Sequence, residues 1–141
     1  MNDRVRNCID GETDPLIWDD TYSVNAHMLD NQHKSLFSII NEVRNACISG
    51  ADKQAMLTVI NKLYDYSATH FRDEESVLRA KDSSLLEQQQ TQHAIFLDYV
   101  ISLEQKIQSD TEMVNQDILT FLQVWWEEHI LKIDKQYSTL F

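Results

Sequence analysis

The sequence predicts an all-α fold, an up-down-up-down antiparallel four-helix bundle with an N-terminal loop. Only two glycines and one proline occur among 141 residues, and a quarter of the residues are charged; this composition favours helix. Apolar residues also recur three and four positions apart in four separate stretches, whereas the alternation typical of strands is hard to find. Because the connections between these stretches are short, consecutive helices are expected to be antiparallel neighbours.

The chain, residues 1–141, is expected to form a single domain, since this length can bury a sizeable core without disulfides. Residues 1–17 are predicted to form an N-terminal arm. The four helices are predicted over about 26–49, 52–80, 84–107 and 112–133, with a glycine at 50 after the first and the polar sequence KDSS at 81–84 after the second.

Stepping by three and four residues gives the side chains expected to face inward. In the first two helices they are Leu29, His33, Leu36, Ile40, Val43 and Cys47, then Met56, Ile60, Leu63, Ser67, His70, Glu74 and Val77. In the last two they are Leu86, Gln89, His93, Phe96, Val100, Leu103 and Ile107, then Ile118, Leu122, Trp125, His129 and Ile133. The core is therefore predicted to be mostly aliphatic, with one imidazole in each helix.

The formal net charge of −11 would repel the phosphates of nucleic acids and anionic lipids. Neither partner is expected. No run of eighteen apolar residues is present, and the first twenty residues contain no apolar segment of the secretory kind, so a cytoplasmic location is predicted. Cys8 and Cys47 lie far apart and predict neither a disulfide framework nor a zinc site.

The four inward-facing histidines are expected to lie at one end of the bundle. His33 and His93 come early in their helices, whereas His70 and His129 come late in theirs. In an antiparallel bundle these positions have similar heights. Buried polar groups without partners cost roughly 1–3 kcal/mol each, and a shared metal ion would satisfy all four imidazoles, together with Glu74 one turn after His70.

His27 is expected to be a surface or helix-entry residue. It precedes His33 by six residues, which rotates it away from the inner face and moves it about 9 Å along the axis. For the inner cluster, imidazoles with a carboxylate suit iron, zinc or copper. The Glu-x-x-His pairs of ferritin-like diiron sites are missing here.

Four motifs resemble those of the hemerythrin family, in its single-domain bacterial form. They are WDDTYSVNAHMLDNQHKSLF at 18–37, HFRDEE at 70–75, QQTQHAIF at 89–96 and HILKID at 129–134. Each motif is weak alone, but four in the right order are specific, and the resemblance runs from Trp18 to about Tyr137.

The resemblance implies two non-heme iron ions joined by an oxo or hydroxo bridge. It assigns the bridging carboxylates to Glu74 and Asp134, one iron with an open position to His33 and His70, and the other iron to His93, His129 and the residue at 89. The expected partners are dioxygen and small anions, and the expected role is binding rather than enzymatic turnover.

Three positions depart from the family or from simple spacing. Gln89 stands where the family has a histidine; it can offer an amide oxygen, orient a metal-bound water, or do neither. Trp126 replaces a residue that is usually leucine near the oxygen pocket, and it is either a core aromatic or a gate to the cofactor. Asp134 follows His129 by five residues, about 140° around a regular helix, so the helix must widen or end there.

Two hypotheses for the function remain open. The first is an oxygen-binding diiron protein acting as a carrier, a store or a sensor. The second is a redox-sensing or metal-sensing input domain in which one iron site is weakened, and which either acts alone or is excised from a signalling protein. A third, a helical interaction module without metal, leaves the four interior histidines unexplained.

Overall fold

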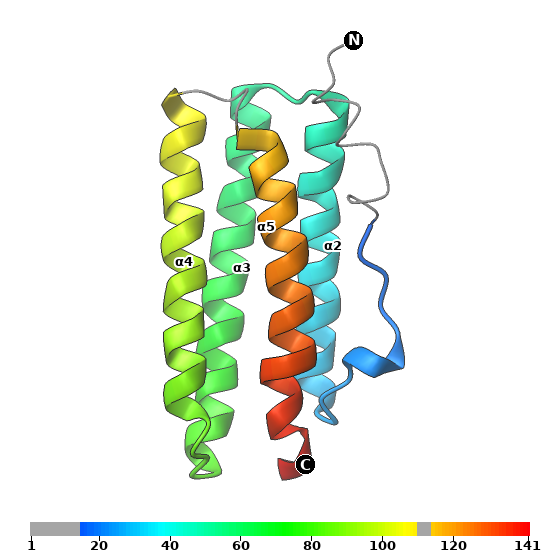
Figure 1. The fold of residues 1–141 in the computed structure, drawn as a ribbon, viewed down its shortest axis with the longest axis vertical. Helices are drawn as coiled ribbons and strands as arrows, with labels where there is room; N and C mark the ends of the chain where they lie inside the picture. Colours follow the sequence, from blue (N-terminus) through cyan, green and yellow to red (C-terminus); the bar gives the residue numbers. More distant parts are fainter. Residues whose placement is uncertain (1–14, 110–113) are drawn as a thin grey trace.

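The computed structural model describes residues 15–109 and 114–141, which form a bundle of four long helices side by side (Figure 1). These helices are α2 (His27–Ser49), α3 (Lys53–Ala80), α4 (Leu86–Ser109) and α5 (Val114–Glu128). A short 3₁₀ turn, η2 (Asp20–Tyr22), precedes them, and α5 continues through a π-helical turn, η3 (His129–Ile133), into a 3₁₀ segment, η4 (Asp134–Leu140). The described residues contain no strand, and the predicted all-α bundle is confirmed.

The helix ends follow the local signals in the sequence. Gly50 takes a left-handed conformation with φ 69°, and its N–H closes the last turn of α2. Asp52 caps α3, since its side chain accepts a hydrogen bond from the N–H of Ala55 at 2.8 Å. α4 begins two residues after its predicted start. The predicted start of the fourth helix, most of the predicted N-terminal arm and Cys8 lie outside the described residues.

The half of the bundle that holds the α2–α3 connection has an aliphatic core. Its completely or almost completely buried side chains are Ile40, Val43, Met56, Ile60, Leu63, Val100, Leu103, Ile107, Ile118 and Leu122. Burying one such side chain contributes about 1.5–3 kcal/mol. The apolar packing of this half therefore stabilises the bundle, and the polar side chains lie in its other half.

Four predicted core positions are wrong by a small rotation. They are Val77, Leu86, Trp125 and Ile133, which are only partly buried. In α5 the buried stripe runs in steps of four from Ile118 and Leu122 to Trp126, and it reaches Ile130 in η3. The π turn then rotates the residues that follow, which include Ile133. None of the described helices is long and apolar enough to cross a membrane.

A small second core closes the polar end of the bundle. It consists of Val24, Leu29, Leu78 and Tyr137, all buried. Asp30 holds the N-terminal segment over this end by accepting hydrogen bonds from the Ser23 hydroxyl at 2.6 Å and the Val24 N–H at 2.8 Å. The chain before α2 and the chain after α5 thus meet above the polar side chains and cover them.

Candidate metal centre

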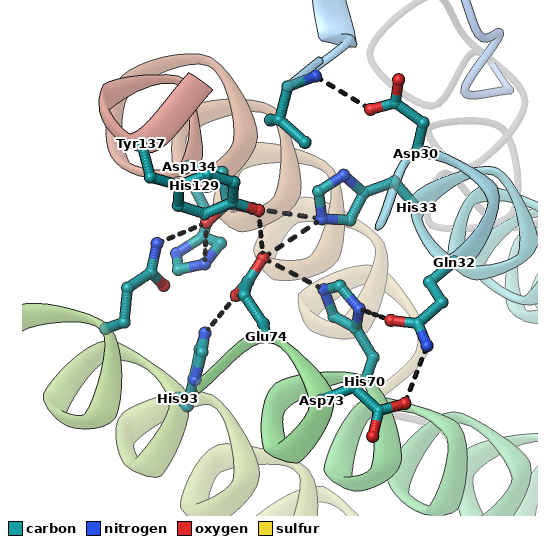
Figure 2. A network of polar contacts seen from close by, with 12 residues as sticks. Asp30, Gln32, His33, His70, Asp73, Glu74, His93, His129, Asp134 and Tyr137 are labelled. Carbon is teal, nitrogen blue, oxygen red and sulfur yellow. Dashed lines mark hydrogen bonds and ion pairs between the residues drawn. The ribbon is translucent and has the colours of Figure 1, made fainter. Parts of the chain in front are cut away.

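All seven residues predicted as metal ligands lie together in the interior, at the end of the bundle that the small second core covers, and Figure 2 labels all of them except Gln89. They are His33 of α2, His70 and Glu74 of α3, Gln89 and His93 of α4, and His129 and Asp134 of the C-terminal turns, each at most 2% exposed. His27, by contrast, is exposed at the first residue of α2, where its ring contacts the amide of Asn31. The structure therefore gathers the predicted ligands and separates the histidine that was predicted to lie outside.

A π-helical turn brings Asp134 to this cluster. A regular α-helix would place a residue five positions after His129 on another face. Here the N–H of Asp134 donates to the carbonyl oxygens of both His129 and Ile130, and the bond to His129 is the i→i+5 contact of a π turn. The wider turn stacks Asp134 above His129, so that Oδ1 of the carboxylate lies 3.0 Å from Nε2 of the imidazole.

One group of ligand atoms lies between α2, α3 and the C-terminal turns. The Nε2 atoms of His33 and His70 lie 3.6 and 3.5 Å from Oε2 of Glu74. The Nε2 atom of His33 also lies 3.2 Å from Oδ2 of Asp134. His33, His70 and Glu74 have the arrangement of a group able to hold a metal ion.

A second group lies on the other side of the same two carboxylates. Nε2 of His93 lies 2.8 Å from Oε1 of Glu74, and Nε2 of His129 lies 3.0 Å from Oδ1 of Asp134. Glu74, His93 and His129 again form a group able to hold a metal ion. Glu74 and Asp134 each turn one oxygen to the first group and the other oxygen to the second, which is the arrangement of bridging carboxylates.

The spacing of these atoms is the one expected of ligands that share an ion. Ligand atoms about 2.1 Å from an ion and at right angles to one another are about 3.0 Å apart. Among the described residues, the Nε2 atoms of His33, His70, His93 and His129 have no hydrogen-bond partner, although all are buried. Buried polar atoms in this condition call for an ion or a water.

Outer hydrogen bonds set the protonation of two of the rings. The Nδ1–H of His70 donates to Oε1 of Gln32 at 2.6 Å, and Gln32 in turn donates from its amide to Asp73 at 2.9 Å. The Nδ1–H of His93 donates to Oε2 of Glu75 at 2.7 Å. With the proton held on Nδ1, each ring presents the lone pair of Nε2 to the centre, as a metal ligand must.

The buried carboxylates dominate the electrostatics of the cluster. Burial raises the pKa of Glu74 and Asp134, but the surrounding imidazoles outweigh it and hold both pKa values below their ordinary range. Burial lowers the pKa of His33, yet Asp134 and Glu74 reverse this effect and raise it to about 9. Burial prevails at His70 and lowers its pKa to about 4. The site keeps negative charge and attracts positive charge, either protons or metal ions.

The sequence analysis did not find the outer residues. Besides Gln32 and Glu75, Tyr137 is completely buried, and its hydroxyl donates to Oε2 of Glu74 at 2.5 Å. The sequence offers one signal for it: Tyr137 follows Asp134 by three residues, one turn along the chain. Gln32 and Glu75 adjoin ligand residues in the chain, which gives no comparable signal.

The two unusual residues also lie at the centre. Nε2 of Gln89 donates to Oδ1 of Asp134 at 2.7 Å, and its Oε1 has no hydrogen-bond partner among the described residues. Trp126 is completely buried, with its ring centroid 6.3 Å from that of His70 and 6.1 Å from that of His129.

A four-helix bundle with two buried histidine groups joined by two carboxylates defines a class of protein, the metal-binding helical bundles. Comparison of the chain with known proteins identifies the family within that class. Residues 24–141 match the family model described as the hemerythrin HHE cation binding domain, and the chain belongs to this family.

The relatives and solved structures agree with this assignment. The chain is 30% identical over 128 residues to the bacteriohemerythrin of Clostridium acetobutylicum, covering 86% of this chain and 98% of the relative. It is 27% identical over 117 residues to the bacteriohemerythrin of Methylococcus capsulatus, covering 83% of this chain and 88% of the relative. The crystal structure of a wild-type hemerythrin superposes with a TM-score of 0.81 at 25% identity, covering 88% of this chain and 95% of that chain.

Proposed function

We propose that this chain is a dioxygen-binding protein that holds two non-heme iron ions with an oxo or hydroxo bridge. The observation that carries the proposal is the orientation of the Glu74 and Asp134 carboxylates. Each carboxylate turns one oxygen to the first histidine group and the other oxygen to the second. His33 and His70 would hold one iron, and His93 and His129 the other, with Gln89 beside the second.

The donor set suits this cofactor. Imidazole and carboxylate are ligands that iron prefers, and the described part of the chain brings no cysteine to the centre. Two ferrous ions, when bound, would supply the electrons with which dioxygen is held reversibly. The family and its relatives support the proposal, since the related proteins are bacteriohemerythrins.

The remaining work belongs to the protein's own side chains. The small second core and the tethered N-terminal segment cover the polar end, so the centre is closed to bulk water. On the inner side, Phe71 stacks on the ring of His93, and Trp126 lies beside the rings of His70 and His129. Phe96 packs against both Phe71 and Trp126. A dry, apolar surrounding favours reversible binding over hydrolytic loss of charged products.

Metal analysis of substituted proteins tests the proposal. His70→Ala and Glu74→Ala should each lower iron per chain and thermal stability together, because a bound ion stabilises only the folded state. His27→Ala is the matched control, an exposed histidine of α2, and should leave both unchanged. The proposal fails if His70→Ala and Glu74→Ala keep the iron content of the unmodified protein.

A second candidate function is a redox or metal-sensing input domain with one weakened iron site. The observation in its favour is the contact of Gln89, whose amide nitrogen is committed to Asp134. Only Oε1 is left to serve a metal, and an amide oxygen is a weaker donor to iron than an imidazole. The iron beside His93 and His129 would then be held less tightly than its neighbour.

Gln89→His decides between the two candidates. If the second site is weak, the substitution should raise iron toward two per chain and slow the loss of the weaker iron to a chelator. Should the unmodified protein already hold two irons firmly, with no gain in the variant, Gln89 is an adequate residue at this position and the weakened-site candidate is refuted.

A further inference from the structure

Two buried polar atoms beside the candidate centre have no partner and no role among the predicted ligands. They are Oγ of Ser67 and Nε1 of Trp126, neither of which has a hydrogen-bond partner among the described residues. Both side chains are completely buried. Unpaired polar atoms at this depth are uncommon and call for an explanation.

Both residues lie in the same layer of the bundle. Ser67 precedes His70 by three residues in α3, and Trp126 precedes His129 by three residues in α5. α3 and α5 run in the same direction and reach the centre with their C-terminal ends (Figure 1). Three residues correspond to about 4.5 Å along the axis, so both side chains belong to the layer directly beneath the centre, on the side of the bundle interior.

The three aromatic side chains that pack against Trp126 offer no acceptor. Its indole packs against the rings of Phe71, Phe96 and Trp125, with centroids 5.9, 5.4 and 4.9 Å away. An indole N–H can only donate, and it cannot bind a metal ion itself. A phenylalanine or leucine would fill an apolar layer without the cost of a buried, unpaired donor.

We propose that the Trp126 N–H and the Ser67 hydroxyl donate hydrogen bonds to a small anionic ligand bound at the metal pair. This inference rests on the proposed function and adds to it a selection among ligands. Azide, or dioxygen once it has gained electron density, carries lone pairs that can accept the hydrogen bonds of both donors. A centre with these donors holds such ligands more tightly than a centre lined only by apolar side chains.

The cleanest test is Ser67→Ala, because it removes one oxygen atom and leaves the packing intact. Azide affinity of the iron-loaded protein, measured by optical titration, should fall about tenfold or more, as expected for a lost hydrogen bond to a charged partner. Ser76→Ala, an exposed serine of the same helix, is the matched control and should bind azide like the unmodified protein. Trp126→Phe should weaken azide binding by a similar factor.

A spectroscopic readout separates hydrogen bonding from packing. The ultraviolet resonance Raman difference between the unmodified protein and Trp126→Phe isolates the bands of this indole, which report whether its N–H is hydrogen-bonded. Azide should shift those bands toward the hydrogen-bonded state. The inference is overturned if iron is bound but Ser67→Ala and Trp126→Phe keep full azide affinity and the indole bands do not move when azide is added. That result is expected if a buried water is the hydrogen-bond partner of the indole.

The two proposals fail in different ways. If the unmodified protein binds no iron, the proposed function fails and the inference falls with it. If it binds iron, and azide affinity is indifferent to both substitutions, only the role of Ser67 and Trp126 is refuted.

Discussion

Replacing Tyr137 by phenylalanine should reveal how much the C-terminal segment contributes to the metal centre. Tyr137 lies in η4, and its hydroxyl donates to Oε2 of Glu74 at 2.5 Å. The substitution keeps the aromatic ring, which packs with Val24, Leu29 and Leu78, and removes only the hydroxyl. The effect should therefore be that of one buried hydrogen bond to a carboxylate.

The expected magnitude follows from the charge of the acceptor. The pKa of Glu74 lies well below its ordinary value, so the carboxylate is ionised at neutral pH. A hydrogen bond to a charged group contributes about 1.5–3 kcal/mol. For a chain of this length the loss corresponds to a decrease of about 5–12 °C in the melting temperature. Losing an outer partner of a bridging ligand should also weaken metal binding about 10- to 100-fold.

Two measurements on Tyr137→Phe check this reasoning. Thermal unfolding of the metal-free protein reports the hydrogen bond, and competition with a chelator reports the metal affinity. Tyr64→Phe, a partly buried tyrosine of α3, is the control and should change neither quantity. If Tyr137→Phe melts at the temperature of the unmodified protein and holds its metals equally well, the contact with Glu74 has no energetic weight and Tyr137 only fills space.

Two further predictions concern pH and access. For the metal-free protein, the raised pKa of His33 (about 9) and the lowered pKa of His70 (about 4) each correspond to about 3 kcal/mol. His33 stabilises the fold below pH 6.5 and loses this effect as pH rises through 9, while the effect of His70 is lost as pH falls from 6.5 toward 4. Urea unfolding of the metal-free protein should give a free energy of unfolding with a maximum near pH 6.5, and bound metal should abolish the loss of stability at alkaline pH. A free energy of unfolding that does not change with pH contradicts this prediction. Trp126→Leu should speed azide association with the oxidised protein, since a smaller side chain opens the layer beneath the centre; an unchanged or slower rate removes Trp126 from the path.

The bundle and the membership of the cluster were predictable because both depend on local periodicity. A histidine at the spacing of a buried helical face can be recognised without knowing its neighbours, and short connections determine which helix ends meet. His33, His70, His93 and His129 therefore lie together as the sequence predicts, and the exposed His27 follows from the same rotation. That these side chains bind iron stays a prediction.

Asp134 marks the limit of this reasoning. Its spacing from His129 fits no regular helix, and the sequence indicated only that the helix must widen or end. The structure widens it through one π turn. The same turn explains why Ile133 is only partly buried, since an added residue rotates the chain that follows it. Nothing in the residue types at 129–133 marks a π turn, because its benefit lies in the placement of Asp134.

Contacts between distant segments were not predictable. Gln32 and Glu75 reach His70 and His93 through side-chain conformations that depend on how α2, α3 and α4 pack. Tyr137 reaches Glu74 across 63 positions of sequence. A pattern of spacing shows which face a residue occupies, but it does not show which atom on that face another chain segment will meet.

Gln89 shows why this distinction matters for the centre. Counted as a ligand, it is a histidine replaced by a weaker donor. The structure adds a contact that an imidazole bound to a metal through Nε2 would not make in the same way. Nε2 of the Gln89 amide donates a hydrogen bond to Oδ1 of Asp134 at 2.7 Å. Oε1 of the same amide is left without a hydrogen-bond partner among the described residues. The amide group presents a donor and an acceptor from one carbon, so a single side chain can fix the bridging carboxylate and still offer an oxygen to a cation. The substitution therefore changes how Asp134 is held as well as how many imidazoles surround the second metal position, and the two effects oppose each other. A weaker ligand loosens the metal, whereas a restrained bridge lowers the entropy lost when the metal binds.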